Sequence, residues 1–278
     1  MLNARVFDGE HRIDAWPADS RGVAYGDGLF ETMRVHAGTI PWWDAHWRRL
    51  AAGAQRLRMP LPDPSRARAE AARLFEDGGD GVLKLLVSRA AGSRGYSPST
   101  HRDPAWMIAR FPLPESVAGG LRACWCETRV SLQPALAGFK HCNRLEQILA
   151  RAECDDAGVD EGLMLDVEGS VVGATSANLF VLGADGWLTP KVDRCGVAGV
   201  CRAHLLVALD ARQVRLSVAD VEGADAVFLS NAVRGILPLA RLATRDWPPH
   251  AAVAAAQQKL AALHQGFAIV GSPATEQS

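Results

Sequence analysis

Four segments of this 278-residue chain combine residue types that can carry out chemistry, and the first contains a lysine. Lys140 lies in GFKHCNRLEQ (138–147), between an irregular stretch and an amphipathic helix. A lysine there can reach into a cleft, lose its proton because burial disfavours the ammonium ion, and act as a nucleophile or a base. A solvated surface lysine fits the same spacing, so the pattern alone leaves both interpretations open.

The second and third segments have the features of an anion site. Gly196 and Gly199 precede an apolar helix within 190–206, and unpaired backbone amides at a helix start bind phosphate. Arg49 lies at the border of an apolar helix stripe, where its guanidinium can donate two parallel hydrogen bonds to phosphate. The alternatives are a plain glycine turn and an arginine whose aliphatic stem covers apolar surface.

The fourth segment, RGVAYGDGLFETMRV (21–35), predicts a tight turn at Gly26-Asp27-Gly28 that leads into a strand. A structural turn without a chemical role explains this pattern equally well. Each of the four segments is common by itself, but the occurrence of all four in this order is a specific pattern.

The composition limits the kinds of partner. Thirty Lys and Arg against 31 Asp and Glu give a net charge of −1, so no global basic field is available for nucleic acid, although a local basic pocket is compatible. No segment has the roughly 18 to 20 apolar residues of a membrane span, and the N-terminus lacks the apolar centre of a signal peptide. The six cysteines form no Cys-x-x-Cys or Cys/His zinc pattern, so we expect reduced thiols in the cytoplasm and no metal.

The elements that must position the four segments alternate between strands and helices. Hairpins are predicted at 1–7 with 11–16 around Asp8-Gly9, at 29–35 with 39–43, and around 184–186. Single strands are predicted at 81–90, 105–113, 121–131, 213–219 and 226–230. Two further strands, at 161–167 and 170–182, are predicted to be joined by a hairpin turn at Glu168-Gly169. Helices are predicted at 44–58 with Asp44 as its cap, at 64–77, at 143–157, from about 199, and at 251–265.

A composition change at 112–120, which has two prolines and two glycines, predicts a linker. We therefore expect an N-terminal domain at 1–112, a linker at 113–120 and a C-terminal domain at 121–278. Mixed strands and helices in two halves are typical of an α+β fold, and the cleft between two domains is a common ligand site.

Together the segments resemble the fold-type IV family of pyridoxal-phosphate enzymes, which includes branched-chain aminotransferases, D-amino acid aminotransferases and aminodeoxychorismate lyases. The resemblance runs from Arg21 to about Leu239. It rests on R-x-x-x-x-G-D-G-L-F-E-T (21–32), H-W-R-R-L (46–50), S-R-A-A-G-S-R-G-Y-S (88–97), F-K-H-C-N-R-L-E-Q (139–147), A-N-L-F (177–180), G-V-A-G-V-C-R (196–202) and S-N-A-V-R-G-I-L-P-L (230–239). Within the family, K-x-x-N-R-L-E-Q and G-x-R-G-Y-S resemble the lyase branch.

The resemblance implies a role for individual residues. Lys140 would form the Schiff base with pyridoxal phosphate in the cleft between the domains, and Thr32 matches a threonine tied to catalysis in the lyase branch. The cofactor phosphate would be held by Arg49, the amides of Val197 and Ala198, and Asn231 with Ala232. The substrate carboxylates would be bound by Arg34, Arg89 and Arg94, each of which is equally explained by a surface ion pair.

One position departs from the family pattern. The family places a glutamate, which keeps the pyridine nitrogen protonated, five residues before the asparagine of A-N-L-F, and here that position is Gly173. Neither Asp166 nor Glu168 is an obvious substitute, and a glycine in a strand often marks close packing of a ring or of another backbone.

The missing carboxylate bears on the expected reaction. An unprotonated pyridine is a poorer electron sink, and transamination depends on that sink more than a lyase reaction that forms an aromatic product. The expected function is therefore conversion of aminodeoxychorismate to 4-aminobenzoate and pyruvate, for folate synthesis, by a cytoplasmic homodimer. The alternatives are a branched-chain or D-amino acid aminotransferase and a catalytically silent pyridoxal-phosphate protein.

Overall fold

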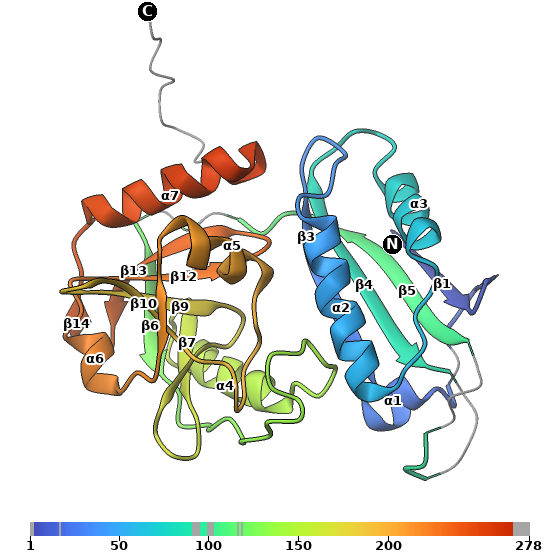
Figure 1. The fold of residues 1–278 in the computed structure, drawn as a ribbon, viewed down its shortest axis with the longest axis horizontal. Helices are drawn as coiled ribbons and strands as arrows, with labels where there is room; N and C mark the ends of the chain where they lie inside the picture. The colour runs from blue at the N-terminus through green and yellow to red at the C-terminus, as the bar shows by residue number, and fades with distance from the viewer. Residues whose placement is uncertain are drawn as a thin grey trace, which may run out of the picture.

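Two β-sheets, built from successive parts of the chain, lie side by side (Figure 1). The structure is a computed structural model, and it describes residues 3–16, 18–90, 95–98, 103–115, 117 and 119–268. The first sheet has the strand order β2-β1-β5-β4-β3, and the second has the order β11-β10-β9-β12-β13-β6-β7-β8, with β14 paired to β13. Within the described part of the chain, no helix is long and apolar enough to span a bilayer.

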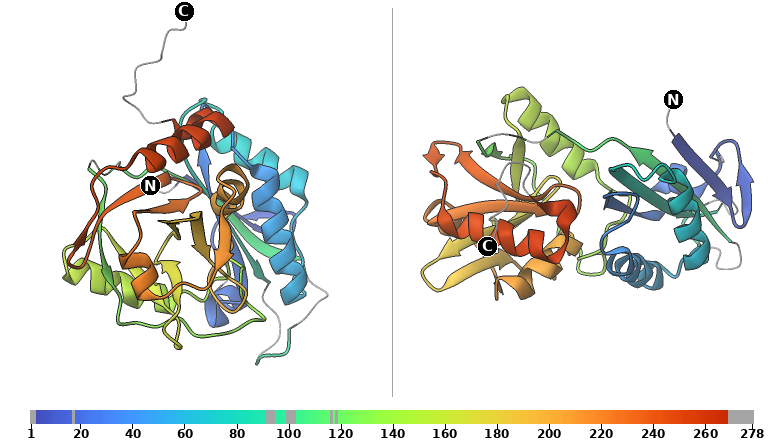
Figure 2. Two further views of the ribbon diagram at one scale, coloured as in Figure 1. Left: turned by 60° about the vertical axis from the view of Figure 1, so that its left-hand side comes forward. Right: turned by 90° about the horizontal axis from the view of Figure 1, so that it is seen from above.

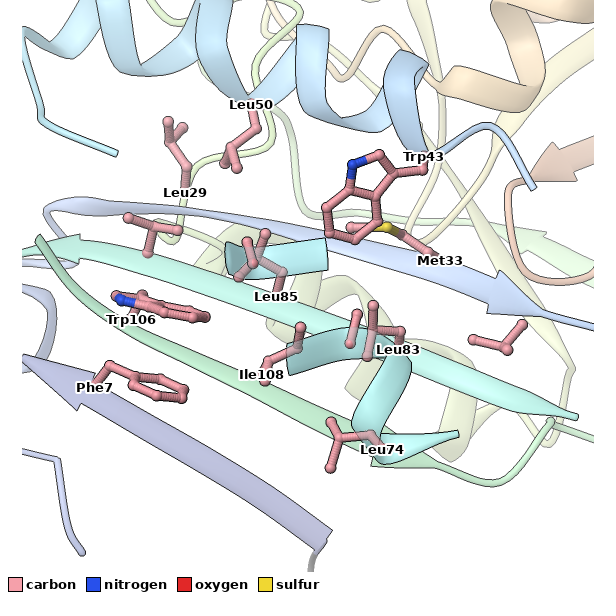
Figure 3. Close-up of a cluster of buried hydrophobic side chains, with 14 of the residues drawn as sticks. Phe7, Leu29, Met33, Trp43, Leu50, Leu74, Leu83, Leu85, Trp106 and Ile108 are labelled. Carbon is pink, nitrogen blue, oxygen red and sulfur yellow. The ribbon is translucent and has the colours of Figure 1, made fainter. Parts of the chain in front are cut away.

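The first sheet is antiparallel and carries its two longer helices on one face. Its elements are β1 (Asn3–Asp8), β2 (His11–Ile13), α1 (Arg21–Tyr25), β3 (Gly28–Val35), α2 (Trp43–Leu57), α3 (Pro64–Leu74), β4 (Gly81–Arg89) and β5 (Pro104–Phe111). Alternate side chains of β3, such as Leu29 and Met33, point towards Trp43 and Leu50 of α2 (Figure 3). Because strand side chains alternate between faces, the other residues of β3, Phe30, Thr32 and Arg34, face away from α2.

The second sheet mixes parallel and antiparallel strands and has helices against several of them. Its elements are β6 (Leu121–Trp125), α4 (Leu145–Asp156), β7 (Glu161–Leu165), β8 (Val171–Ala174), β9 (Asn178–Gly183), β10 (Gly186–Pro190), α5 (Val200–Ala208), β11 (Arg212–Val214), α6 (Val218–Glu222), β12 (Ala226–Asn231), β13 (Gly235–Leu242), β14 (Arg245–Asp246) and α7 (Ala251–Leu263), followed by a short 3-10 helix (Gln265–Phe267). Helix α4 packs on β7, α5 on β12, and α7 on β12 and β13. Figure 2 shows α7 and β1 on opposite sides of the molecule.

Most of the expected elements are present with small shifts of their ends. The hairpin at Asp8-Gly9 is confirmed, and so is the turn before β3, where Gly26 adopts a left-handed φ of 63° and closes α1. The hairpin around 184–186 is confirmed by the pairing of β9 with β10. Asp44 is not the cap of α2, because Trp42 holds the N-cap position and Asp44 lies in the first turn.

Several expectations about strands are wrong. Residues 39–43 contribute only a single bridge between His36 and Thr39. The expected strand at 170–182 is broken after Ala174 into β8 and β9. The strand expected at 213–219 is only β11, because Ser217 caps α6 with reciprocal hydrogen bonds to Asp220. Strand β13 and the short helix α1 were not expected at all.

Each sheet takes its strands from one side of residues 112–120. We propose that residues 1–112 and 121–278 form two domains and that residues 113–120 link them.

Candidate active site

Lys140 lies where the two sheets meet. The backbone N–H of Phe30 in β3 donates to the Lys140 carbonyl at 2.9 Å, and the N–H of Cys142 donates to the Gly28 carbonyl at 2.9 Å. Residues 140–142, which belong to the second half of the chain, therefore run antiparallel beside the edge strand β3 of the first sheet. The Lys140 Nζ lies 4.5 Å from the centre of the Phe30 ring, on the face of β3 opposite α2.

The surroundings of Lys140 favour its neutral amine. Burial lowers the pKa of Lys140 to about 8, and the positive charge of Arg49 adds to this effect, while Glu31 opposes it. Relative to an ordinary lysine pKa of 10.5, the neutral amine is about 300-fold more populated at pH 7. The residue can therefore act as a nucleophile or a base, as its place in the sequence indicated.

Arg144 fixes the backbone on both sides of Lys140. Its Nε donates to the His141 carbonyl at 2.8 Å and its Nη2 donates to the Phe139 carbonyl at 3.0 Å. Asn143 ties the same loop to the first sheet, because its Nδ2 donates to the Gly26 carbonyl at 3.1 Å. The sequence contains both residues in K-x-x-N-R-L-E-Q, but the motif alone did not assign them this role.

Arg49 belongs to a buried ionic network. Its Nε donates to Glu31 Oε1 at 2.8 Å, its Nη2 donates to Glu31 Oε2, and its Nη1 donates to the Ala198 carbonyl at 3.0 Å. A guanidinium has five N–H donors, so these three contacts leave two N–H groups for another acceptor. The predicted contact with a phosphate therefore fits the donors that Arg49 has left.

Glu31, the partner of Arg49, and His46, the partner of Glu31, complete this network, and neither was predicted from the sequence. The Glu31 side chain is 1% exposed, and His46 Nδ1 lies 2.6 Å from its Oε2. Burial alone would raise the pKa of Glu31, but the charge of Arg49 and the hydrogen bonds from His46 and Arg49 lower it below its usual value. Burial lowers the pKa of His46, so a neutral imidazole donates its Nδ1–H to the carboxylate. The His-x-x-Arg spacing, one helical turn apart, was the available signal for His46.

The glycine-rich segment before α5 offers fewer free amides than expected. The Ala198 N–H donates to the Gly138 carbonyl at 3.0 Å, so the expected role of this amide in phosphate binding is wrong for this conformation. Among the described residues, the N–H groups of Val197 and Val200 have no hydrogen-bond acceptor. The helix start itself has no side-chain cap at Gly199. Val197 and the first turn of α5 thus remain available to an anion.

Asn178, the asparagine of A-N-L-F, supports this segment. Its Nδ2 donates to the Val197 carbonyl at 2.9 Å. A Cβ atom at Gly199 would lie 2.1 Å from the Asn178 Oδ1, so the close approach requires a glycine there. Asn178 therefore fixes the orientation of the Val197 peptide.

The turn between β12 and β13 holds the other expected phosphate residues. Asn231 Oδ1 accepts hydrogen bonds from the N–H groups of Val233 at 3.0 Å and Arg234 at 2.8 Å, so this oxygen stabilises the turn. The Ala232 carbonyl accepts a hydrogen bond from the Arg34 N–H at 3.4 Å, which places the turn beside β3. The structure thus brings Asn231 and Ala232 to the junction of the sheets, and their contact with phosphate remains a proposal.

The three arginines expected to bind substrate carboxylates have different surroundings. Arg34 donates from Nη1 to the Val233 carbonyl at 2.9 Å and keeps a buried Nε without a partner among the described residues. Arg34, but not Lys140, borders a cavity of about 740 Å³ that Phe267 and residues of 113–120 also line. Arg34 therefore remains a candidate at the far end of β3 from Phe30. Arg94 lies outside the described residues.

Arg89 does not fit the expected role. It is 3% exposed, and its Nη1 and Nη2 donate to the carbonyls of Arg58 at 2.9 Å and Leu57 at 2.7 Å. Its Nε pairs with Asp27 at 3.0 Å. The expectation of a substrate arginine is wrong here, because the guanidinium is used to hold the end of α2 and the turn before β3.

Thr32 lies beside a second lysine on the face of β3 that points away from α2. Thr32 and Lys84 are directly paired on β3 and β4, and Lys84 Nζ lies 5.5 Å from the centre of the Phe30 ring. Lys84 and Lys140 therefore share one aromatic neighbour, and the charge of Lys84 contributes to the lowered pKa of Lys140. Lys84 was missed, although a single lysine inside the apolar run GVLKLLVS was the available signal.

Gly173 has a backbone conformation that suits glycine. Its φ is 153°, and a Cβ atom there would lie 3.1 Å from the Ala177 carbonyl oxygen. This contact agrees with close packing of another backbone against the strand. Of the two acidic residues nearby in sequence, Glu168 pairs with Arg194 at the surface and Asp166 accepts hydrogen bonds from the N–H groups of Glu168 and Ser170.

Comparison with known proteins agrees with this arrangement. Residues 28–242 match the model of the family described as amino-transferase class IV. The chain belongs to this family. It is 35% identical over 241 residues to an aminodeoxychorismate lyase of Vibrio harveyi, a match that covers 83% of this chain and 88% of that protein.

Solved structures extend the class IV comparison to the fold. A crystal structure of 4-amino-4-deoxychorismate lyase from Pseudomonas aeruginosa matches with a TM-score of 0.85 and 40% identity, covering 92% of this chain and 98% of that one. The branched-chain amino acid aminotransferase of Escherichia coli matches with a TM-score of 0.84 at 18% identity, covering 98% of both chains, which shows a shared fold. These matches confirm the resemblance and the α+β fold-type IV architecture expected from the sequence.

Proposed function

We propose that this chain is a pyridoxal-phosphate-dependent lyase that converts 4-amino-4-deoxychorismate to 4-aminobenzoate and pyruvate. The observation that carries the proposal is the environment of Lys140. Burial and the charge of Arg49 lower its pKa to about 8, and Arg144 fixes the backbone on both sides of it. Two similar proteins, at 35% and 40% identity, are named as this lyase, which supports the choice of reaction.

The residues present fit the cofactor. Two unused N–H groups of Arg49, together with the N–H groups of Val197 and Val200, would hold its phosphate, and the Lys140 amine would hold its aldehyde carbon. When bound, pyridoxal phosphate supplies an aldehyde that condenses with amines and a ring that accepts electrons. Arg49 thus sets the position of one end of the cofactor and Lys140 that of the other.

Lys140 is also the group that would move a proton. With the substrate amino group in place of the lysine, the free Lys140 Nζ would remove the proton from C4 of the substrate. The C–O bond to the enolpyruvyl group would break and the six-membered ring would become aromatic. The group would leave as enolpyruvate, whose methylene carbon takes up a proton to give pyruvate. Thr32 and Lys84 are paired on the same face of the first sheet as Phe30, which supports a role for both in contacting the substrate.

Gly173 favours the lyase over an aminotransferase. With no carboxylate at this position, the chain would lack the side chain that keeps the pyridine nitrogen protonated in the family, and the bound ring would be the weaker electron sink. Aromatisation of the product lowers the barrier from the side of the substrate, so the lyase reaction tolerates this loss. Transamination gains no such help.

We also propose a cytoplasmic homodimer. Leu145, Ile148 and Leu149 of α4 are 74%, 61% and 60% exposed, and they follow the Lys140 loop directly. Such an apolar surface is typical of a contact between copies. The six cysteines are unpaired, which suits a reducing compartment.

The deciding experiment incubates the purified protein, loaded with pyridoxal phosphate, with enzymatically made aminodeoxychorismate. We expect equal amounts of 4-aminobenzoate and pyruvate, and no product with the matched Lys140→Ala variant. Borohydride reduction and peptide mapping should place the cofactor on Lys140. Amino-group transfer to keto acids without pyruvate release would favour an aminotransferase, and a stable yellow protein with neither activity would favour the silent alternative.

A further inference from the structure

Three cysteines that are not all neighbours in the sequence meet where α4 packs on the second sheet. Cys124 is in β6, Cys126 follows two residues later, and Cys154 is near the end of α4. Their Sγ atoms all lie within 4.8 Å of one another. The spacing of the cysteines in the sequence matches no zinc pattern and predicts no metal, but ligands that only the fold brings together leave no such spacing.

The protein leaves space for the three sulfurs at Gly162 of β7. A Cβ atom at this position would lie 2.3 Å from the Cys126 Sγ and 2.5 Å from the Cys154 Sγ. Any other residue would therefore displace the cluster. The φ of Gly162 is not one that requires glycine, so the sulfur atoms themselves explain the small residue.

The backbone around the cysteines is held in place. Glu153, next to Cys154, accepts hydrogen bonds from the N–H groups of Glu127 at 2.6 Å and Thr128 at 3.0 Å, which follow Cys126. The Cys126 N–H donates to the Leu163 carbonyl at 2.9 Å. The three ligands are thus positioned before any ion binds, which reduces the entropy lost on binding.

We propose that Cys124, Cys126 and Cys154 form a binding site for a soft d10 cation such as cuprous copper or cadmium. With bonds of about 2.3 Å, the zinc–sulfur length, three sulfurs in a trigonal plane would lie about 4.0 Å apart. The longer bonds of cadmium would place them further apart, and the sulfurs of the cluster lie within 4.8 Å of one another. Thiolates select soft cations. Zinc is less well suited, because its structural sites take four ligands.

Burial sets the chemistry of loading. Cys126 is 2% and Cys154 0% exposed, while Cys124 is partly exposed and gives a path of entry. A free cysteine has a pKa of about 8.5, so the three side chains are thiols at neutral pH before an ion binds. A divalent cation that forms bonds to two thiolates and one thiol breaks two S–H bonds, releases two protons to solvent and leaves no net charge in an apolar region. Ionisation of the third thiol releases a third proton.

The test uses cadmium chloride and the reduced holoenzyme. We expect one cadmium ion per chain, an ultraviolet thiolate-to-cadmium charge-transfer band, and release of two to three protons. Because even outer-shell changes at metal sites cost about 10- to 100-fold in affinity, Cys124→Ser should weaken binding by more than about 100-fold. Cys124 is partly exposed, so this variant is suited to keep its fold, which circular dichroism checks.

The matched control is Cys142→Ser, which changes another partly buried cysteine in the same way. It should bind cadmium as the unchanged protein does, and Cys154→Ser should lose binding as Cys124→Ser does. The proposal is overturned if the unchanged protein shows no charge-transfer band, if Cys124→Ser binds with full affinity, or if Cys142→Ser loses binding to the same extent.

Discussion

Replacement of Arg49 by alanine is expected to weaken cofactor binding. Two of its N–H groups are free to contact a phosphate, because the other three bind Glu31 and the Ala198 carbonyl. A hydrogen bond to a charged group contributes about 1.5–3 kcal/mol, so the loss of two is at least about 3 kcal/mol. The affinity for pyridoxal phosphate should fall by at least about 100-fold.

The same change is expected to destabilise the protein without cofactor, for a different reason. Arg49 and Glu31 are 12% and 1% exposed, so removal of the arginine leaves a buried carboxylate with only His46 beside it. Removal of one partner of a buried ion pair costs about 3–5 kcal/mol. The free energy of unfolding of Arg49→Ala should be lower by about that amount at neutral pH.

The loss of stability should depend on pH. In the unchanged protein the pKa of Glu31 is below its ordinary value of 4.5, so its contribution to stability is present above that value and is lost as the pH falls through the folded-state pKa. Without Arg49, burial dominates and raises the pKa of Glu31. The variant then loses stability as the pH rises through this raised pKa, so the two proteins should differ most at pH 8 and least near pH 5.

Urea unfolding of the apoproteins at pH 5 and pH 8 measures these differences. The key comparison is the double variant Arg49→Ala with Glu31→Gln, in which no buried charge is left unpaired. It should regain about 1–3 kcal/mol at pH 8 relative to Arg49→Ala but should still bind pyridoxal phosphate weakly. Additive losses of stability, or a double variant that recovers cofactor affinity, would refute the reasoning.

Three further predictions concern Lys140 and its surroundings. The rate at which the apoprotein takes up pyridoxal phosphate should rise about tenfold per pH unit and level off near pH 8, where Lys140 loses its proton; a rate that still climbs at pH 10 would contradict the lowered pKa. Arg144→Lys keeps the positive charge but loses the paired hydrogen bonds to the carbonyls of Phe139 and His141, so stopped-flow assays should show kcat about 100-fold lower with unchanged KM. An unchanged kcat would show that Arg144 does not position Lys140. The free energy of unfolding of Gly173→Ala and of Gly173→Glu, measured by thermal unfolding, should each fall by about 1–3 kcal/mol because of the φ of 153°. Gly173→Glu should also increase transamination much more than lyase turnover. A comparable increase in both rates would contradict the argument from the pyridine nitrogen.

The sequence predicted those parts of the fold whose signal is local. The apolar stripe at 44–58 predicted a helix, and the structure has α2 at Trp43–Leu57. A stripe of this length at helical spacing is a strong signal for a helix. Strand β13 was missed, since Pro238 interrupts an apolar run and the strand forms only through its pairing with β12 and β6. Helix α6 was missed because five residues give too short a period to detect.

The site shows the same division between local and distant signals. Lys140 and Arg49 were found from motifs, and the structure brings both to the junction of the sheets. Glu31 was missed because its partners lie on another element and meet it only in the folded chain. Arg89 was misassigned for the converse reason, since the sequence shows a cation but not the carbonyls of residues 57 and 58 that occupy it.

A chain with a net charge of −1 can still select an anionic ligand, because its cations gather around Lys140. Arg49, Arg144 and Lys84 contribute three positive charges and Glu31 one negative charge, so the local sum is +2 when Lys140 is neutral. Glu31 is already paired with Arg49, which leaves the excess charge for a ligand. The same cations that attract a phosphate dianion also lower the pKa of Lys140. A bound dianion would offset their charge and raise the pKa of the Lys140 amine. Cofactor binding itself would therefore prepare this lysine to accept the substrate proton.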